Sequence, residues 1–406
     1  MKTNLLRAAL FTPMRRGSWG LPILLWGLPG VAKSAILRWL AEEYNMPIEI
    51  LSPAARGEGA FGVTPVPGEG GRMTYPRPDW TDKFDKGQRG IVFIDEINLA
   101  ATHYAGALLG LLQDRILGSY CLGPNVRIFA AANPIELAAA SGGWDLSAPA
   151  ANRVGHIEWP CPDVQAWTDW FFSDDEVAKE FTNAEGEEKR VMGLWPAAWG
   201  KARGMVAGFL ATNSTHLHAM PKDGSAQTSK AWPSPRSWEY AARALASAEV
   251  HDLSEVERNE FVGAFVGQGS AGEFFTWYTQ ANLPDSADLL DGKVSWKHKA
   301  SRLDITTAVF GSAVAVCVAT VDPAQRKARG ERMWDLLAQA SESSPDLIVT
   351  AAKILVGVKI FTGAVKTLAK LKPLLVAAGV LAGADETNIP GGTPISERTA
   401  YAATSL

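Results

Sequence analysis

The sequence predicts an α/β fold in which a parallel sheet with flanking helices is followed by a helical lid and a helical C-terminal extension. Short apolar runs recur through the first 160 residues, with helical stretches between them. This pattern is typical of buried parallel strands joined by helical crossovers. Polar residues follow several of the runs, at the strand ends where open parallel sheets bind ligands. After Pro160 the pattern is mainly helical.

The predicted elements of the sheet begin with a strand that leads through a glycine-rich turn into a helix. Further apolar runs predict three more strands. A Gly- and Pro-rich stretch between the first helix and the second strand is too irregular for a core helix and predicts a projecting hairpin. The ranges are strands at 23–26, 91–94, 127–132 and 156–159, a helix at 34–44, and the hairpin region at 53–85.

The remaining sequence predicts helices separated by polar loops. The uncharged run at 305–321 is short for a membrane span and predicts a buried helix. Lysines punctuate the region from 347 to 384, which favours amphipathic helices. Other helices are expected at 162–172, 196–211 and 236–249. The predicted domains are a nucleotide-binding core at 1–163, a helical lid at 164–300, and a helical extension with a flexible tail at 301–406.

Composition narrows the range of functions. The 406 residues are 47% hydrophobic, with a net charge of −4 and a pI near 5.9. This charge gives no general attraction to polyanions, so nucleic acid is not the expected partner. Three scattered cysteines predict reduced thiols rather than disulfides or a metal site. With no export signal and no membrane segment expected, we predict a cytoplasmic protein.

The stretch GLPGVAKS at 27–34 nearly matches the phosphate-loop template, with Ala32 in place of the last glycine. Backbone N–H groups and a helix N-terminus would face the phosphates, the lysine would neutralise their charge, and the hydroxyl would reach Mg²⁺. A small residue fits at position 32 if its φ is negative. The alternative is a plain turn before a helix. The expected nucleotide-binding residues are Gly27, Leu28, Pro29, Gly30, Val31, Ala32, Lys33 and Ser34, and Ser34 is also an expected Mg²⁺ ligand.

Two acids, Asp95 and Glu96, directly follow the apolar run at 91–94. Both fall at the ligand end of the predicted sheet. Asp95 is expected to hold Mg²⁺, through water, and Glu96 to orient and deprotonate an attacking water. The alternative is a helix-capping Asp-Glu pair after a core strand. Because the phosphate loop occurs in the same chain, we favour the nucleotide site.

Asn133 follows the apolar run at 127–132 and precedes Pro134. It would place an uncharged polar group near the γ-phosphate and the attacking water. An ordinary Asn-Pro turn is the alternative.

These stretches, in their order and spacing, resemble the AAA+ ATPases, and specifically the MoxR branch of that family. The resemblance covers about the first 250 residues and implies an AAA+ P-loop NTPase core that uses ATP or ADP and Mg²⁺. Ala32 is compatible with it, since a GxxGxAKS loop resembles loops of active relatives. The motifs are GLPGVAKS, GVTPVPGEGGRMTYPRPDW, IVFIDEINLA, ALLGLLQDR, IFAAANP, LSAPAANRVGHI and WPSPRSWEYAARAL.

The resemblance also implies roles for two arginines. Arg153, in AANRVGHI, matches the arginine finger, which would reach the γ-phosphate of a neighbouring subunit. Arg236, in PSPRSW, matches the sensor 2 arginine that the lid contributes to nucleotide in the same subunit. Val154 departs from the family's common phenylalanine after the finger. The alternatives are a surface ion pair for Arg153 and a helix-start arginine without a ligand for Arg236.

A finger supplied in trans requires an oligomer, and the resemblance implies a hexameric ring. Such a ring would remodel, activate or assemble a partner protein, possible partners being proteins with a von Willebrand factor A domain. The hairpin at 61–75 would face the pore or the substrate, or pack between subunits. Two other functions stay open: a nucleic-acid motor, which the acidic balance disfavours, and a nucleotide-gated assembly module in which Ala32 slows turnover.

Overall fold

The computed structural model describes residues 2–56, 58–62, 64–100, 105–140, 145–163, 183–222, 229–361 and 365–381. The chain divides into two compact units. Unit 1 comprises Met1–Trp195 and His216–Glu273, and unit 2 comprises Pro196–Thr215 and Phe274–Leu406. These two units differ from the three domains predicted at 1–163, 164–300 and 301–406. The division into three domains stays a prediction.

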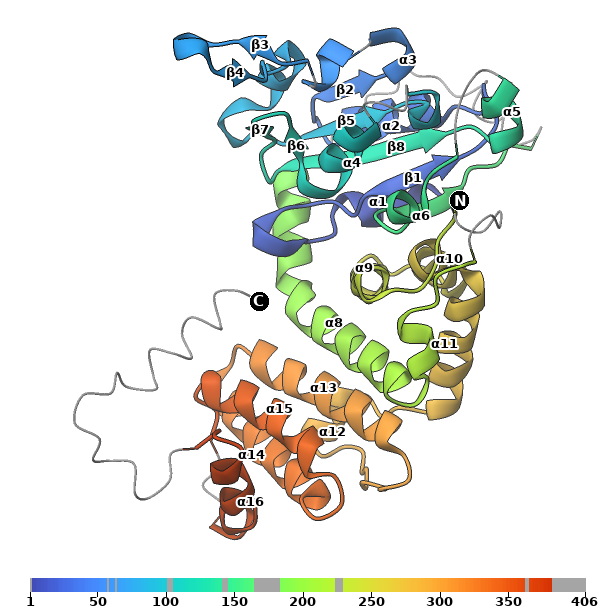
Figure 1. Ribbon diagram of the computed structural model, residues 1–406. Coiled ribbons are helices and arrows are strands. Elements are labelled where there is room, and N and C mark those ends of the chain that lie inside the picture. The colour runs from blue at the N-terminus through green and yellow to red at the C-terminus, as the bar shows by residue number, and fades with distance from the viewer. Residues whose placement is uncertain are drawn as a thin grey trace. The chain divides into compact units, whose positions relative to one another are not determined.

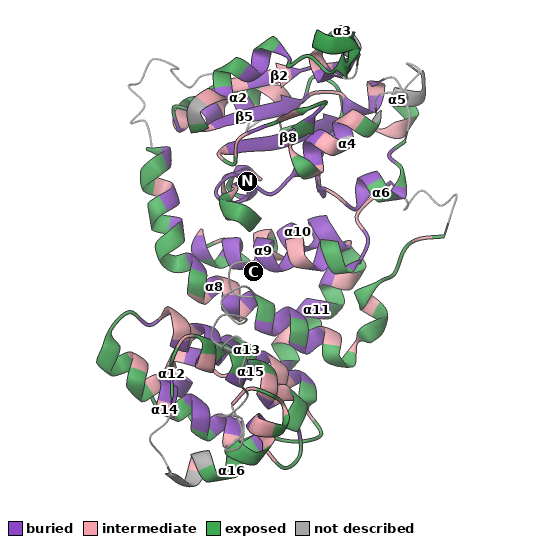
Figure 2. Ribbon diagram, turned by 60° about the vertical axis from the view of Figure 1, so that its left-hand side comes forward, coloured by how far each residue is buried: buried purple, intermediate pink, exposed green. Residues whose placement is uncertain are grey.

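Unit 1 is built on a parallel five-stranded sheet with the strand order β2-β5-β8-β1-β9 (Figure 1). All four pairings are parallel. The two strands β5 and β8 are buried along their whole length and are purple in Figure 2. The strands are β1 Ile23–Trp26, β2 Ile48–Leu51, β5 Gly90–Ile94, β8 Val126–Ala132 and β9 Gly155–Glu158. The predicted α/β fold, a parallel sheet with flanking helices followed by further helices, is confirmed.

The sequence prediction missed strand β2. Its four residues, IEIL, include a charge, Glu49, which is almost fully buried. Two cations compensate for this burial, Arg56 at 2.6 Å and Lys83 at 2.5 Å from the carboxylate oxygens. The strand was missed because a charged residue interrupts its short apolar run. The cations that make burial of this charge possible lie in other segments of the sequence.

Two small hairpins accompany the sheet. One joins β3 (Val66–Pro67) to β4 (Met73–Thr74), inside the stretch where a projecting hairpin was predicted. The other joins β6 (Ile116–Leu117) to β7 (Tyr120–Cys121) and was not predicted. They are in contact, since Ser119 Oγ donates to the Tyr75 carbonyl at 3.1 Å.

Helices surround the sheet of unit 1 (Figure 1). Helix α10 packs on the edge strand β9 so closely that a Cβ added to Gly155 would lie 2.5 Å from the Phe265 ring. The predicted helices at 34–44 and 236–249 are confirmed as α2 and α9. The helices are α1 Thr3–Leu10, α2 Lys33–Glu43, α3 Pro53–Arg56, α4 Ala105–Asp114, α5 Ile135–Ala140, α6 Ala148–Ala151, α9 Pro235–Val250 and α10 Glu255–Val266. Short 3₁₀ turns occur at Arg15–Gly17, Glu58–Phe61, Glu69–Gly71, Asp79–Gly87, Ile97–Leu99 and Ser214–Leu217.

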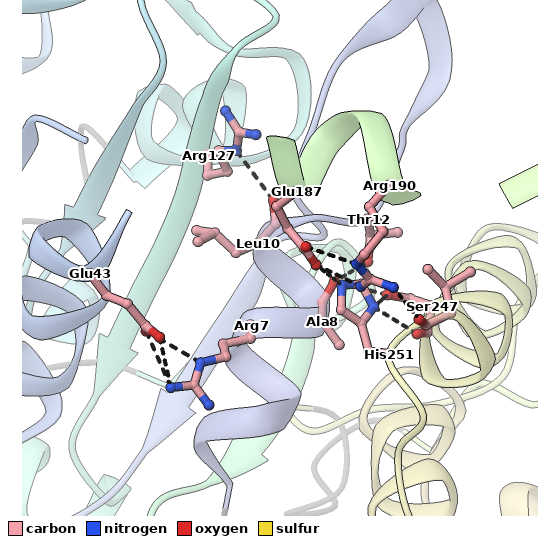
Figure 3. A network of polar contacts seen from close by, with 11 residues as sticks. Arg7, Ala8, Leu10, Thr12, Glu43, Arg127, Glu187, Arg190, Ser247 and His251 are labelled. Atoms are coloured by element: carbon pink, nitrogen blue, oxygen red, sulfur yellow. Dashed lines mark hydrogen bonds and ion pairs between the residues drawn. The ribbon is translucent and has the colours of Figure 1, made fainter. Parts of the chain in front are cut away.

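A polar network anchors the start of helix α8 (Ala184–Thr212) in unit 1 (Figure 3). Glu187 pairs with Arg190 at 2.6 Å and with His251 at 3.5 Å, and the hydrogen bond from Arg190 is the main cause that lowers the pKa of Glu187 to about 2. The next residue, Glu188, pairs at 2.5 Å with Arg127 of β8, whose side chain is fully buried. The first turns of α8 are therefore held by an ion pair to the sheet and by the contact of Glu187 with His251, directly after α9.

Unit 2 is helical. It contains α8 from Pro196 onward, which includes the predicted helix at 196–211, and most of α11 (Gln268–Ala281). The predicted buried helix at 305–321 is α13, and two helices lie in the lysine-punctuated region after residue 347. The remaining helices are α12 Ser286–Leu290, α13 Leu303–Ala319, α14 Pro323–Ala340, α15 Pro345–Gly357 and α16 Val365–Ala377. Most of the predicted helix at 162–172, and the tail after residue 381, lie outside the described residues.

None of the helices in the described ranges has the length and apolar character needed to cross a bilayer. All three cysteines are free thiols, and Cys317 is buried while Cys121 and Cys161 are exposed. Burial is the main cause that raises the pKa of Cys317 to about 11.

Candidate phosphate-binding site

Three strand ends meet at one edge of the sheet. The loop at 27–32 follows β1, Asp95 and Glu96 follow β5, and Asn133 follows β8. Because β8 lies between β1 and β5 and all three strands are parallel, their carboxyl ends point the same way. The structure thus brings together the loop, the acids and the asparagine that the sequence singled out.

Lys33, the first residue of α2, lies across the loop. Its ammonium Nζ donates to the carbonyl oxygens of Gly27 at 2.7 Å and Leu28 at 2.9 Å, and to Asn133 Oδ1 at 3.2 Å. The side chain is buried, and this desolvation lowers the pKa of Lys33, while the negative charges of Asp95 and Glu96 act in the opposite direction. An anion bound in the loop would compensate for the buried charge.

Ser34 and Asp95 are in direct contact. The Ser34 hydroxyl donates to Asp95 Oδ2 at 2.5 Å, although the two residues belong to different elements, α2 and the end of β5. A hydroxyl and a carboxylate oxygen at this separation form the kind of oxygen donor set that Mg²⁺ takes together with phosphates and water. The two residues predicted to bind the metal therefore fit the ion.

Asn133 bridges the cation and the second acid. Its Oδ1 accepts from Lys33, while its Nδ2 donates to Glu96 Oε1 at 3.3 Å. Its main chain is held in turn by the fully buried Asn98, which donates to the Asn133 carbonyl at 2.9 Å and accepts from the Asn133 N–H at 3.2 Å. Asn98 was missed from sequence, although it closes the IDEIN stretch two residues after Glu96.

The backbone of the loop corrects one expectation. A small side chain was expected to fit at position 32 if its φ is negative. Ala32 instead has φ +64° and ψ +28°. An L-residue in this left-handed region has a strain of about 1 kcal/mol, which glycine avoids. Glu96 is also left-handed, with φ +54°. Non-glycine residues in this conformation gather at functional sites.

The loop presents unpaired donors at the start of α2. Among the residues that the structure describes, the N–H groups of Ala32, Lys33 and Ser34 have no hydrogen-bond acceptor. Such groups at the start of a helix of this length, together with a buried lysine, attract anions. The loop therefore fits a phosphate chain.

The two predicted arginines lie in different settings. Arg153 follows α6, where its guanidinium donates to Gln113 of α4 and, at 3.0 Å, to the Pro149 carbonyl. Arg236 is exposed in the first turn of α9, and within the described ranges no hydrogen bond or ion pair holds it. The structure therefore places both arginines but brings neither into contact with the loop residues.

A buried polar pair links the segments that carry these arginines. Asn152, next to Arg153, accepts a hydrogen bond from the Ser234 hydroxyl at 2.6 Å and donates to the Trp232 carbonyl at 2.9 Å. Ser234 is the N-cap of α9 and accepts from the Ser237 N–H at 3.1 Å. Sequence inspection missed Asn152, because its partners lie about eighty residues away in the chain.

A metal ion at this site would have to be held partly by the nucleotide. Across the described ranges, no group of three or more His, Cys, Asp or Glu side chains could hold one. Mg²⁺ is often bound by one or two carboxylates together with substrate phosphates. The pair of Ser34 and Asp95 suits that arrangement.

No family model matches the sequence. No curated protein matches it either. Among solved structures, one similar chain is the crystal structure of a "putative ATPase" from Cytophaga hutchinsonii. The two share 13% identity over 65% of this chain and 80% of the other, with a TM-score of 0.44. A likeness at that level assigns no function to this chain.

Proposed function

We propose that this protein is an ATPase of the AAA+ class, of the MoxR type, that hydrolyses ATP with Mg²⁺. The observation that carries the proposal is the bridging position of Asn133, whose amide bonds both Lys33 and Glu96. This one side chain ties the cation of the loop to the acid of the neighbouring strand. A plain turn before a helix, or a capping Asp-Glu pair, gives no reason for that connection.

Bound ATP with Mg²⁺ would supply the terminal phosphoryl group that is transferred to water. Lys33 would neutralise phosphate charge beside the free N–H groups of α2, and Ser34 and Asp95 would hold the metal. Glu96 would orient the attacking water and accept its proton. Asn133 would fix the Glu96 carboxylate relative to the Lys33 ammonium. Arg236 would contact nucleotide in its own subunit, and Arg153 would reach that of a neighbour.

The proposal includes a homo-oligomeric ring, hexameric by analogy, since Arg153 is assigned to a neighbouring site. In this assembly ATP turnover would remodel, activate or assemble a client protein in the cytoplasm, for example one with a von Willebrand factor A domain. The exposed hairpin β3–β4 is a candidate for client contact, because Met73 is 60% exposed and Val66 39% exposed.

A nucleotide-gated assembly module with little turnover is the second candidate. The observation that favours it is the left-handed Ala32, because strain next to the phosphates could slow the cycle. In that case ATP would drive assembly without steady release of phosphate. We favour the ATPase because Glu96 is already held beside Lys33 through Asn133. The nucleic-acid motor has no comparable observation in its favour.

The test is the substitution Glu96→Gln. The variant keeps a side chain that can accept from Asn133 but cannot take a proton, so ATP hydrolysis should fall by roughly a hundredfold or more. ATP affinity should change by less than about threefold, because binding rests on the loop. Phosphate release and a titration with ATP and Mg²⁺ measure the two effects.

The matched control is Glu255→Gln, at an exposed carboxylate in the first turn of α10. Its turnover should equal that of the unmodified protein. Normal hydrolysis in Glu96→Gln would show that Glu96 is not the base. Absence of steady turnover in the unmodified protein, with ATP-driven assembly, would favour the second candidate.

A further inference from the structure

Trp159, the residue directly after β9, contacts the phosphate loop through two of its groups and the last residue of β1 through a third. Its backbone N–H donates to the Trp26 carbonyl at 2.6 Å, and its indole Nε1 donates to the Val31 carbonyl at 3.1 Å. Its own carbonyl lies so close to Gly27 that an added Cβ there would be 2.5 Å away. Trp159 thus touches the loop at its start and near its end, from a different strand.

The indole bond fixes the orientation of one peptide group. The peptide between Val31 and Ala32 is planar and trans, so its carbonyl and its N–H point in opposite directions. With the carbonyl held by Trp159, the Ala32 N–H points away from the indole. That N–H has no acceptor within the described part of the chain, and it stands beside the free N–H groups of Lys33 and Ser34.

The same peptide group is the one under strain. Ala32 is left-handed, with φ +64°, and an alanine there would gain stability by leaving that region. Rotation of the peptide would turn the Val31 carbonyl toward the place of the phosphates and the Ala32 N–H away from it. A glycine at position 32 would have no such tendency. The indole bond therefore matters because the residue is alanine: it opposes the rotation that would relieve the strain.

We propose that Trp159 is a positioning residue for the phosphate loop: its indole N–H holds the Val31–Ala32 peptide so that the Ala32 N–H faces the bound phosphates. The inference rests on the proposed function in one respect, since it requires a nucleotide in the loop. It adds a residue from beyond the loop and a reason why alanine is tolerated at position 32.

The experiment uses the full chain with ATP or ADP and Mg²⁺. Trp159→Phe keeps an aromatic ring but loses the donor, so nucleotide affinity should fall roughly tenfold and KM should rise to match. The kcat value should change by less than about twofold, because the indole does not touch the reacting atoms. Introducing Ala32→Gly into the Trp159→Phe variant should restore affinity to within about threefold, since glycine adopts the left-handed conformation without help.

Two further variants complete the design. Trp334→Phe removes a comparable indole bond, to the Ile360 carbonyl at 3.0 Å in unit 2, and should leave nucleotide affinity unchanged. Ala32→Val should lower affinity while Trp159 is intact, because a β-branched residue resists a positive φ more than alanine does. This variant keeps the proposal testable if Trp159→Phe does not fold.

The outcomes separate the inference from the proposed function. A lower Tm in Trp159→Phe with unchanged affinity would overturn the inference, because Trp159 would then only pack. Failure of Ala32→Gly to restore affinity, or normal binding by Ala32→Val, would overturn it as well. If the unmodified protein binds neither ATP nor ADP, the proposed function itself is wrong.

Discussion

At the scale of single residues, His156 shows how the sheet fixes a protonation state beside the loop. Its Nδ1 accepts from the Trp26 indole at 2.8 Å, so its Nε2 carries the proton and donates to the Ala151 carbonyl at 2.8 Å. Burial is the main cause that lowers the pKa of His156 to about 4, the nearby Lys230 acts in the same direction, and the bond to Ala151 opposes both. The neutral imidazole therefore persists into moderately acid solution.

This predicts a dependence of stability on pH. The unfolded histidine takes up a proton as the pH falls below about 6.5, whereas the folded one stays neutral until about pH 4. The unfolded state thus binds more protons in this window, and the free energy of unfolding should decrease by about 3 kcal/mol as the pH falls from 6.5 to 4. Denaturant titrations at several pH values measure it.

The variant His156→Gln isolates that contribution. A glutamine can accept from Trp26 and donate to Ala151 but does not titrate. The difference in unfolding free energy between the two proteins should therefore shrink with acidity across the same window. Parallel curves for the two proteins would contradict the assignment.

Some residues of the site can be identified from their neighbours in the sequence, and others cannot. Lys33, Asp95 and Glu96 could be singled out from sequence, because the loop template and the acids after an apolar run depend only on neighbours in the chain. Asn98 and Trp159 could not, since their partners are main-chain groups of distant elements. The sign of φ at Ala32 is likewise a property of the folded loop.

At the scale of elements, a row of glycines lets α8 approach α13 closely inside unit 2. Gly200, Gly204 and Gly208 stand four residues apart, so they share one face of α8. An added Cβ at Gly204 would lie 2.8 Å from the Ala308 carbonyl oxygen and from the Ser312 nitrogen. The two helices therefore meet backbone to backbone along this face.

Replacing Gly204 should separate them. Gly204→Ala places a methyl group against main-chain atoms that cannot move aside, and the free energy of unfolding of unit 2 should fall by roughly 1–3 kcal/mol. Gly193→Ala is the control on the same helix, because an added Cβ there has nothing within 4 Å. That change should raise the free energy of unfolding by roughly 0.5–1 kcal/mol, because alanine has a higher helix propensity than glycine.

Denaturant unfolding followed by circular dichroism compares the two variants. A gain in stability for Gly204→Ala would show that the helices have room between them. The spacing of these glycines is visible in the sequence, but which helix faces them is not, because α13 begins about ninety residues later. The β6–β7 hairpin was missed for a different reason: its strands have only two residues each, too few to show an alternating pattern.

At the scale of the whole molecule, each compact unit is assembled from separate stretches of chain. Unit 2 takes Pro196–Thr215 from the middle of the sequence and joins it to Phe274–Leu406. A reading of composition along the chain finds boundaries where character changes, near residues 163 and 300. The compact units have a boundary elsewhere, between Trp195 and Pro196, so helix α8 begins in unit 1 and ends in unit 2.

The proposed ring makes a prediction that only an assembly can meet. Glu96→Gln and Arg153→Ala should each be nearly inactive alone, since one lacks the base and the other lacks the finger. In a mixed assembly, an Arg153→Ala subunit supplies Glu96 and its Glu96→Gln neighbour supplies Arg153. Random mixing in equal amounts should make roughly a quarter of such head-to-tail interfaces complete.

Phosphate release measured before and after mixing tests this. Recovered activity would support a finger acting between subunits. A mixture that stays at the mean of the two separate variants would show that Arg153 does not act on a neighbour. Size measurement with and without ATP serves as the control for assembly.

The left-handed Ala32 has a consequence for how this sequence can change through mutation. Alanine and glycine codons differ by a single nucleotide, so the residue that would relieve the strain is one step away. If Trp159 supports the alanine as proposed, the order of steps matters: glycine first leaves Trp159 free to vary, whereas loss of Trp159 first passes through a chain that binds nucleotide poorly. The residues allowed at position 32 and at position 159 would then depend on one another during evolution.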